Sequence, residues 1–226
     1  IMTPYITYEN LQNHNILQYI YADSETDYYW SDDFSEQFYI SLAQAGFICV
    51  THAQEEQLFL LPEIQKSYAV LDFENLHISK KVLKLLRKEQ FELRFNSAFD
   101  EVIAQIQSSF EPCWLTGDYA TLMQKLASKK YDNFSLFSCE LFDKEKGTLI
   151  AGEIGYITQG VYTSLSGFCS KEKAYANWGT LQLVLLAQAL EKSVKFWNLG
   201  HPYMEYKIAL GAKVLTRDTF LERWYQ

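Results

Sequence analysis

A β-meander in the second half of the chain most strongly constrains its fold. Three segments with strand-like patterns, 134–142, 148–157 and 161–169, follow one another closely, and the first turn carries Lys144-Glu145-Lys146-Gly147. Helical patterns precede this meander, and a long apolar helix and a short strand follow it; these segments are 33–45, 79–88, 98–108, 118–127, 177–192 and 194–198. This order predicts an α/β (α+β) protein with helices covering a sheet.

Serine residues mark the start of two of these helices. Ser35 and Ser79 each stand just before an apolar-periodic segment, where a hydroxyl can accept a hydrogen bond from the first helical turn. In the second helix the buried side is expected to be Val82, Leu83, Leu85 and Leu86. A last strand-like stretch is expected before Trp224.

The helix at 79–88 also carries the densest group of positive charges in the chain. Its basic residues are Lys80, Lys81, Lys84, Arg87 and Lys88. The net charge of the whole chain is −8, so no general field draws it to DNA or to an anionic membrane. Two interpretations stay open for this helix: a solvated face, or a contact surface for a phosphate backbone.

Composition indicates a soluble protein without a metal or cofactor site. Cys49, Cys113, Cys139 and Cys169 lie far apart, and the spacing of histidines, cysteines and carboxylates suggests no ligand set. No apolar run reaches membrane-spanning length, and the first residues lack the pattern of a signal peptide. We therefore expect free thiols, a cytoplasmic location and no membrane partner. The chain has 4 Pro and 10 Gly and no Ser/Gly-rich linker.

Several short motifs occur in a constant order from about Asp33 onward. They are Asp33-Phe34-Ser35, Gly46-Phe47, Leu76-His77-Ile78-Ser79-Lys80-Lys81, Ala98-Phe99-Asp100-Glu101-Val102-Ile103, Cys113-Trp114-Leu115-Thr116, Ser138-Cys139-Glu140, Leu149-Ile150-Ala151-Gly152-Glu153-Ile154-Gly155, Leu210-Gly211-Ala212 and Arg217-Asp218-Thr219-Phe220. In order and spacing they resemble the leucyl/phenylalanyl-tRNA–protein transferase family. No single motif is specific, so the collinear order carries the resemblance.

The resemblance implies a GNAT-like acyltransferase domain with a mixed sheet over residues 67–226, after a small N-terminal α/β domain over 1–66. It implies transfer of an amino acid from a charged tRNA to the amine of a protein or peptide N-terminus, without a cofactor. The basic helix would then contact tRNA, and Trp114 would stack near its terminal adenosine. By position, substrate-binding residues would be Trp114, Ile154, Tyr162, Ser166, Phe168, Leu181 and Val184, although the apolar members could equally be core residues.

The chain departs from the family where the chemistry is expected. The family's Gly-Glu-Ser-Met-Phe-Ser falls on Ser164-Leu165-Ser166-Gly167-Phe168-Cys169, so an apolar side chain replaces the acid. Its Asp-x-Gln falls on Asn198-Leu199-Gly200. Asn198 can still form hydrogen bonds, and the imidazole of His201 could accept the proton of an amine. We predict Asn198 and His201 as catalytic residues; the alternative for His201 is a histidine that caps a turn.

Other polar residues and other functions stay open at this point. Further candidate side chains are Glu140, Glu153, Glu205, Tyr206 and Lys207, of which the charged ones could be structural or simply exposed. A GNAT-type N-acyltransferase using acyl-CoA would need a phosphate-binding loop near 174–180, which holds a single glycine. A non-catalytic binding relative is the third possibility.

Overall fold

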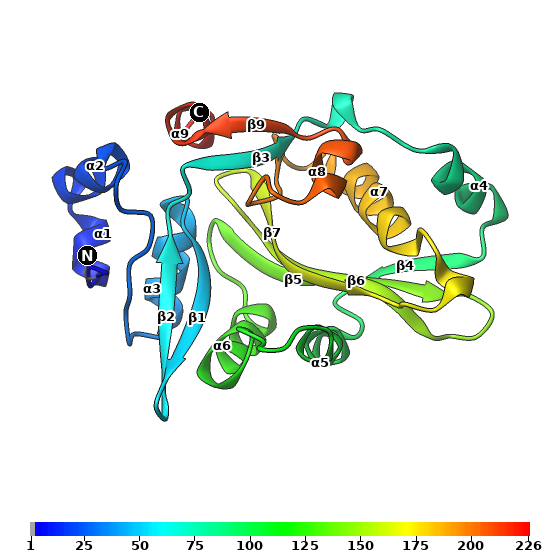
Figure 1. Cartoon of the computed structure of the whole chain (residues 1–226), viewed down its shortest axis with the longest axis horizontal. Coiled ribbons are helices and arrows are strands. Elements are labelled where there is room, and N and C mark those ends of the chain that lie inside the picture. The colour runs from blue at the N-terminus through cyan, green and yellow to red at the C-terminus, as the bar shows by residue number, and fades with distance from the viewer. Residues whose placement is uncertain (1–2) are drawn as a thin grey trace.

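The computed structural model describes residues 3–226 and contains two sheets within that range (Figure 1). A hairpin is formed by β1 (Ile48–Gln54) and β2 (Gln57–Glu63), and a seven-stranded sheet has the order β4-β5-β6-β7-β8-β3-β9. The strands of the large sheet are β3 (Ser67–Leu71), β4 (Phe91–Phe95), β5 (Phe134–Asp143), β6 (Leu149–Thr158), β7 (Val161–Cys169), β8 (Trp197–Asn198) and β9 (Lys213–Thr216). Strands β7 and β8 are parallel and the other pairs antiparallel, so the expected mixed sheet and meander are confirmed.

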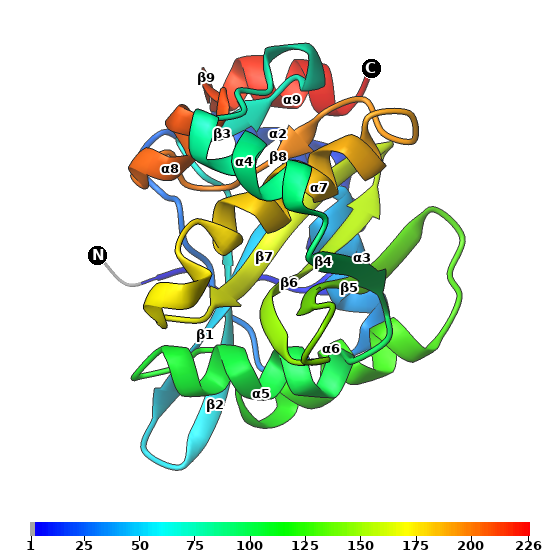
Figure 2. The same ribbon diagram turned by 90° about the vertical axis from the view of Figure 1, so that its right-hand side faces the viewer.

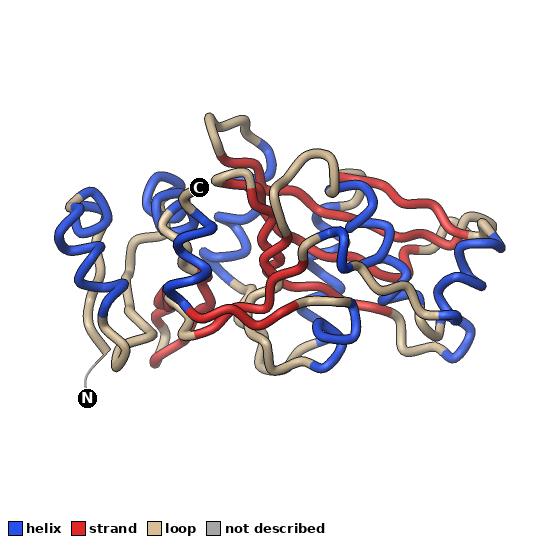
Figure 3. Tube along the Cα trace, turned by 90° about the horizontal axis from the view of Figure 1, so that it is seen from above, coloured by secondary structure: helices blue, strands red, loops and turns tan. Residues whose placement is uncertain are grey.

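Helices cover both faces of the large sheet (Figures 1 and 2). One face carries α7 (Trp178–Leu190), with α4 (Lys80–Lys88) and α8 (Glu205–Leu210) on the same side, and the other carries α5 (Phe99–Ser109) and α6 (Gly117–Ser128). The remaining helices are α1 (Tyr8–Gln12), α2 (His14–Ala22), α3 (Glu36–Gln44) and α9 (Arg217–Trp224), with short 3-10 turns at Phe73–Asn75 and Lys173–Tyr175. Seen from above, the long strands run along the molecule away from its N-terminal helices (Figure 3).

The expected helix starts are confirmed. The Ser35 hydroxyl accepts a hydrogen bond from the Phe38 N–H at 3.3 Å, and the Ser79 hydroxyl accepts one from the Val82 N–H at 3.3 Å. In α4, Val82 is buried and Leu85 and Leu86 are half-buried, but Leu83 is 38% exposed. The expectation for Leu83 was wrong because α4 is covered along a narrow stripe, where it contacts α7.

The end of the chain differs from the expected strand. Only Lys213–Thr216 is extended, as β9, and the residues after it form α9. The Thr216 hydroxyl accepts a hydrogen bond from the Thr219 N–H at 3.4 Å and caps that helix. Phe220 and Trp224, four residues apart, then lie on its buried face. The helical period of these aromatic residues therefore overrides the strand-like appearance of the segment.

The apolar core consists of two clusters, one on each face of the sheet. The cluster under α7 includes Tyr162, Leu181 and Trp197. The cluster on the α5 and α6 side extends through Tyr68 to Phe38 of α3. Residues before β3 and residues of the large sheet and its helices therefore pack in one continuous cluster. The chain passes from the hairpin to the large sheet at residues 64–67, and the division into domains 1–66 and 67–226 stays a prediction.

Arg217 joins the N-terminal part to the large sheet. Its side chain is 7% exposed and pairs with the Asp27 carboxylate at 2.9 Å. The same guanidinium donates to main-chain oxygens of the N-terminal part, those of Tyr21, Asp23, Ile64 and Gln65. A planar group with several N–H donors can satisfy many carbonyl groups at once, and Arg217 thereby holds the end of α2 and the segment after β2 in one place.

We predict that Arg217→Met lowers the free energy of unfolding by about 3 kcal/mol or more, because it leaves Asp27 and several carbonyl groups without their buried donor. Arg223→Met is the matched control on the same helix. Its side chain is 31% exposed and pairs with Asp72, so we expect a loss of at most about 1 kcal/mol. Urea denaturation of both variants measures the difference, and equal losses would contradict a special role for Arg217.

Candidate functional site

The large sheet opens where β7 and β8 part. Strand β8 pairs with β7 only through Trp197 and Asn198, which lie opposite Tyr162 and Thr163. Beyond Thr163, β7 continues to Cys169 and is paired, among the described strands, with β6 alone. Polar side chains from β6, β7, β8 and α8 lie near this opening. The open edge of a sheet between diverging strands is a place where a ligand can bind without breaking the ladder.

A β-bulge interrupts β7 beside this opening. Ile154 lies opposite Ser166 and Gly155 lies opposite Ser164, so Leu165 is the extra residue of the bulge. Leu165 packs against the apolar cluster on the α5 and α6 side. The position that holds an acid in the resembled motif is therefore an apolar residue that faces the core.

A buried carboxylate lies one strand away, on the face covered by α7. Glu153 of β6 is 4% exposed, and it accepts hydrogen bonds from the Tyr162 hydroxyl at 2.8 Å, the Ser164 hydroxyl at 2.7 Å and the Gln182 amide at 3.4 Å. Burial raises the pKa of Glu153, and these hydrogen bonds oppose the shift. The Trp197 indole N–H donates to the Ser164 hydroxyl at 2.8 Å and so ties β8 to the same cluster.

Gly155 makes room for the tyrosine of this cluster. A β-carbon at position 155 would lie 2.3 Å from the Tyr162 hydroxyl oxygen, so any side chain there would push the phenol away from Glu153. Gly155 ends the Leu149-Ile150-Ala151-Gly152-Glu153-Ile154-Gly155 motif, which was the signal in the sequence for this arrangement. The motif alone did not show that Gly155 leaves room for Tyr162, the residue that donates a hydrogen bond to Glu153.

Lys207 brings a buried amine to the same region. It lies on α8, is 6% exposed, and donates to the His201 carbonyl at 2.6 Å. Burial lowers the pKa of Lys207 to about 8, and the charge of Glu153 acts in the opposite direction. An amine in this condition can exchange protons close to neutral pH. The sequence suggested Lys207 only as one of several candidates or as an exposed charge, and the exposed alternative is wrong.

Asn198 organises the loop after β8. Its side chain is buried, its amide nitrogen donates to the Thr163 hydroxyl at 3.3 Å, and its amide oxygen accepts a hydrogen bond from the Gly200 N–H at 3.0 Å. Gly200 has φ +73°, a conformation that favours glycine. Asn198 thus directs the chain toward His201, and its predicted catalytic role stays a prediction.

His201 lies at the edge of the site and contacts the N-terminal part. Its Nε2 atom is 2.8 Å from the carboxylate of Glu63, which is buried at the end of β2. The imidazole stacks on Tyr203, with ring centroids 5.2 Å apart. Sequence reasoning missed Glu63, because 138 residues separate it from His201 and no motif points to it.

The predicted substrate-binding residues fall on both faces of the sheet. Tyr162, Leu181 and Val184 lie in the cluster under α7. The remaining members lie on the α5 and α6 side, where Ser166 pairs with Ile154 across the strands; they are Trp114, Ile154, Ser166 and Phe168. The two groups therefore lie on opposite faces of the sheet and do not form one surface. The substrate-binding role stays a prediction for both groups.

The five basic residues of α4 are all exposed, and none of them forms an ion pair within residues 3–226. Glu205 and Tyr206 are also exposed. Glu140 is buried and accepts a hydrogen bond from the Ser97 hydroxyl at 3.0 Å, which supports the structural alternative for this residue. Across residues 3–226, no cluster of three or more histidine, cysteine or acidic side chains is placed to hold a metal, and no helix could span a bilayer.

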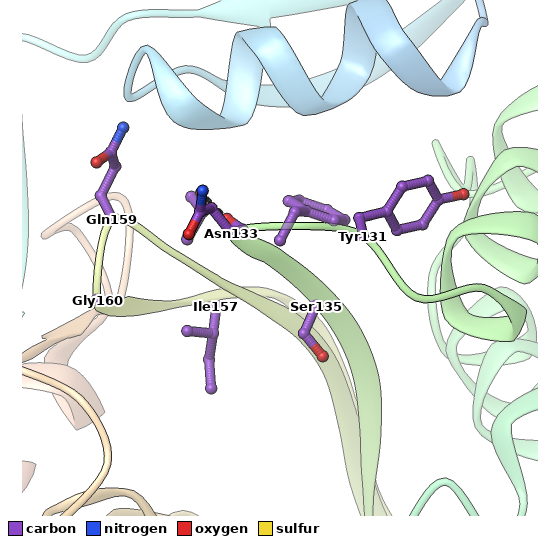
Figure 4. Close-up of a pocket in the computed structure, with 8 residues that line it drawn as sticks. Tyr131, Asn133, Ser135, Ile157, Gln159 and Gly160 are labelled. Carbon is purple, nitrogen blue, oxygen red and sulfur yellow. Dashed lines mark hydrogen bonds between the residues drawn. The ribbon is translucent and has the colours of Figure 1, made fainter.

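An open pocket of about 530 Å³ lies elsewhere, at the turn between β6 and β7 (Figure 4). Its lining includes Tyr131, Asn133, Ser135, Ile157 and Gln159. None of the lining side chains is a carboxylate, an amine or an imidazole. The pocket therefore offers volume but no group that could accept or donate a proton near neutral pH. The polar cluster near Glu153 offers a buried carboxylate and a buried amine, so it is the stronger candidate for a reactive site.

Comparison with known proteins connects this geometry to one family. The model of the leucyl/phenylalanyl-tRNA protein transferase family matches residues 70–225. The chain belongs to this family. The match includes Glu153, Ser164, Asn198, His201 and Lys207, but it begins after Glu63.

Curated relatives in this family match at low identity. The leucyl/phenylalanyl-tRNA–protein transferase of Maridesulfovibrio salexigens is 27% identical over 158 residues, which cover 68% of this chain and 62% of the relative. That of Gloeobacter violaceus is 25% identical over 124 residues, which cover 55% of this chain and 60% of the relative. The matched part thus spans less than two thirds of either relative.

The solved structure of FemX shares the fold. It aligns over 98% of this chain and 81% of its own, with a TM-score of 0.50 and 10% sequence identity. The predicted fold, a mixed sheet flanked by helices, is confirmed.

We predict that Lys207 gives this protein a distinct stability profile in alkaline solution. Below pH 8 the side chain is charged in both states, and the folded state bears the cost of burying that charge. Between about pH 8 and 10.5 the folded state loses the proton while the unfolded state keeps it, so this cost disappears as the pH rises. Lys207→Met removes the effect.

The measurement is urea denaturation at several pH values from 7 upward. The free energy of unfolding of the wild type, relative to that of Lys207→Met, should increase as the pH rises from about 8 to 10.5. The exposed Lys213→Met serves as control and should show a constant difference from the wild type. A constant difference for Lys207→Met as well would contradict the buried, easily deprotonated amine.

Proposed function

We propose that this chain transfers an aminoacyl group from a charged tRNA to the amine of a protein or peptide N-terminus. The observation that carries the proposal is the buried polar cluster around Glu153, which lies at the opening between β7 and β8 and inside the family-matched residues. The altered positions Leu165, Asn198 and Gly200 imply that the chemistry is arranged differently here from the motifs that the chain resembles.

The reaction needs little covalent machinery from the protein. The amine nitrogen attacks the ester carbonyl carbon, the new C–N bond forms as the ester C–O bond breaks, and the amine proton finally passes to the departing ribose oxygen. The site must position both substrates, accept that proton and stabilise the oxyanion of the tetrahedral intermediate. His201 is the group proposed to carry the proton, and the Lys207 amine, when protonated, can stabilise negative charge.

Loss of the imidazole should then impair turnover. In a transfer assay with mixed charged tRNAs and peptides with a free N-terminus, we expect His201→Ala to lower kcat by about 100-fold. Asn198→Ala should also lower transfer. It removes the hydrogen bonds of the Asn198 amide with the Thr163 hydroxyl and the Gly200 N–H, which hold the loop that carries His201. The exposed His52→Ala is the matched control and should keep wild-type activity.

Failure of transfer with every charged tRNA, from folded wild-type protein, would overturn the proposed function. Transfer from acyl-CoA under the same conditions would identify an N-acyltransferase instead. Activity with neither donor would indicate a non-catalytic binding relative.

The exposed basic face of α4 is proposed to contact the tRNA backbone. The double substitution Lys84→Glu with Arg87→Glu should weaken tRNA binding by about tenfold or more and reduce the salt dependence of binding, since fewer counterions are released. Lys125→Glu with Lys130→Glu makes the same charge change on exposed lysines at α6, on the opposite face. Equal weakening by both pairs would show a nonspecific charge effect and contradict a tRNA surface on α4.

A further inference from the structure

The end of β2 contributes a charged group to the site from outside the family-matched residues. Glu63 precedes residue 70, where the match begins, and yet its carboxylate oxygen lies 2.8 Å from the His201 Nε2 atom. Gln65 of the same segment lies beside Gly200, the residue before His201 in that loop, with its amide nitrogen 3.8 Å from the place where a β-carbon of Gly200 would be. The loop after β8 is therefore held from the N-terminal side.

Glu63 has no lysine or arginine partner within the described residues. It is 6% exposed, and its ion pair is the one with His201. The Tyr28 phenol lies against it; burial, followed by the charge of Glu63, raises the pKa of that phenol, so Tyr28 stays a neutral neighbour. Removing a carboxylate from water costs several kcal/mol, and an apolar residue would pack a purely structural site at least as well. The position of Glu63 thus calls for a functional reason.

The imidazole of His201 is restrained on several sides. Glu63 faces Nε2, the Tyr203 ring stacks on the imidazole at an interplanar angle of 19°, and Lys207 holds the main-chain carbonyl. Within residues 3–226, Nδ1 makes no hydrogen bond, and the side chain is 38% exposed. The titratable groups facing His201 are therefore Glu63 from β2, Tyr203 from its own loop and Lys207 from α8, with Tyr28 behind Glu63.

A carboxylate beside one ring nitrogen determines which tautomer the imidazole adopts. The proton stays on the nitrogen that faces the carboxylate, and the other nitrogen keeps its lone pair for a substrate. Nε2 faces the buried Glu63, and Nδ1 is the nitrogen left for the substrate. The arrangement matches the physical requirement for a general base that is oriented by a third group.

We propose that Glu63 is a positioning residue, which keeps the His201 proton on Nε2 and directs Nδ1 toward the attacking amine. Nδ1 accepts the proton as the amine nitrogen bonds to the ester carbonyl carbon, and returns it to the departing ribose oxygen. The identity of the amine rests on the proposed function, but the orientation of His201 by Glu63 does not. This residue links the N-terminal part of the chain to the chemistry of the family-matched part.

The first arm of the test is turnover. Glu63→Met removes the carboxylate and keeps an unbranched side chain of similar length, and we expect kcat to fall by about 100-fold with a small change in KM. Glu63→Gln keeps an oxygen that can accept from Nε2 and should restore part of the rate. The control is Glu56→Met, which removes an exposed carboxylate from the turn before β2 and should leave kcat unchanged. Thermal melts establish that each variant is folded.

The second arm measures His201 without any transferase assay. Diethyl pyrocarbonate acylates neutral imidazole, and peptide mass spectrometry reports the rate at His201 alone. In alkaline buffer, where imidazole is neutral, we expect Glu63→Met to slow this modification by about threefold. Without the carboxylate the proton is no longer held on Nε2, so in part of the molecules it occupies Nδ1, the nitrogen that faces away from Glu63. Glu56→Met should leave the rate unchanged.

The two arms separate the two proposals. Slower modification in Glu63→Met without transfer by the wild type would support the role of Glu63 and overturn the proposed function. Faster modification would show that the pairing merely shields the ring, because release from Glu63 makes Nε2 available as well, and would overturn the role of Glu63. An unchanged kcat in folded Glu63→Met from an active protein would overturn it too.

Discussion

The buried guanidinium of Arg217 is the interaction on which the rest of the structure depends. It joins the first turn of α9, which packs on β3, to the Asp27 carboxylate and to main-chain oxygens at the end of α2 and just after β2. Because Ile64 and Gln65 are among its partners, Glu63 is brought to the loop after β8. A site assembled from two distant parts of the chain requires such a rigid attachment, since a small displacement would separate Glu63 from His201.

The opening between β7 and β8 explains how the site differs from the resembled motifs. The bulge at Leu165 turns an apolar residue toward the core where an acid would be expected. The buried acid of this chain is Glu153, on the neighbouring strand and on the face under α7. Its cost of burial is offset by hydrogen bonds from Tyr162 and Ser164 and by the nearby charge of Lys207. The polar groups near the opening between β7 and β8 therefore come from positions other than those of the resembled motifs.

Sequence reasoning predicted more of the fold than of the site. The meander, the serine-capped helices and the family were accessible because each depends on residues close together in the chain or on a collinear set of motifs. The helix α9 was misjudged, and Leu83 was expected in the core. Asn198 and His201 were named as candidates, but their partners Thr163 and Glu63 could not be, since hydrogen bonds between distant segments leave no periodic pattern.

The sequence by itself determined the sheet-forming meander, the helices around it and the family, because short-range patterning and turn chemistry act locally. Only the tertiary structure decided which carboxylates are buried, that Lys207 is withdrawn from water, and that Glu63 meets His201 across 138 residues. The physical reason is that solvation and electrostatics depend on every neighbour in space. The sequence shows where a charged group stands in the chain, and the fold determines how strongly its charge is screened and which atom it faces.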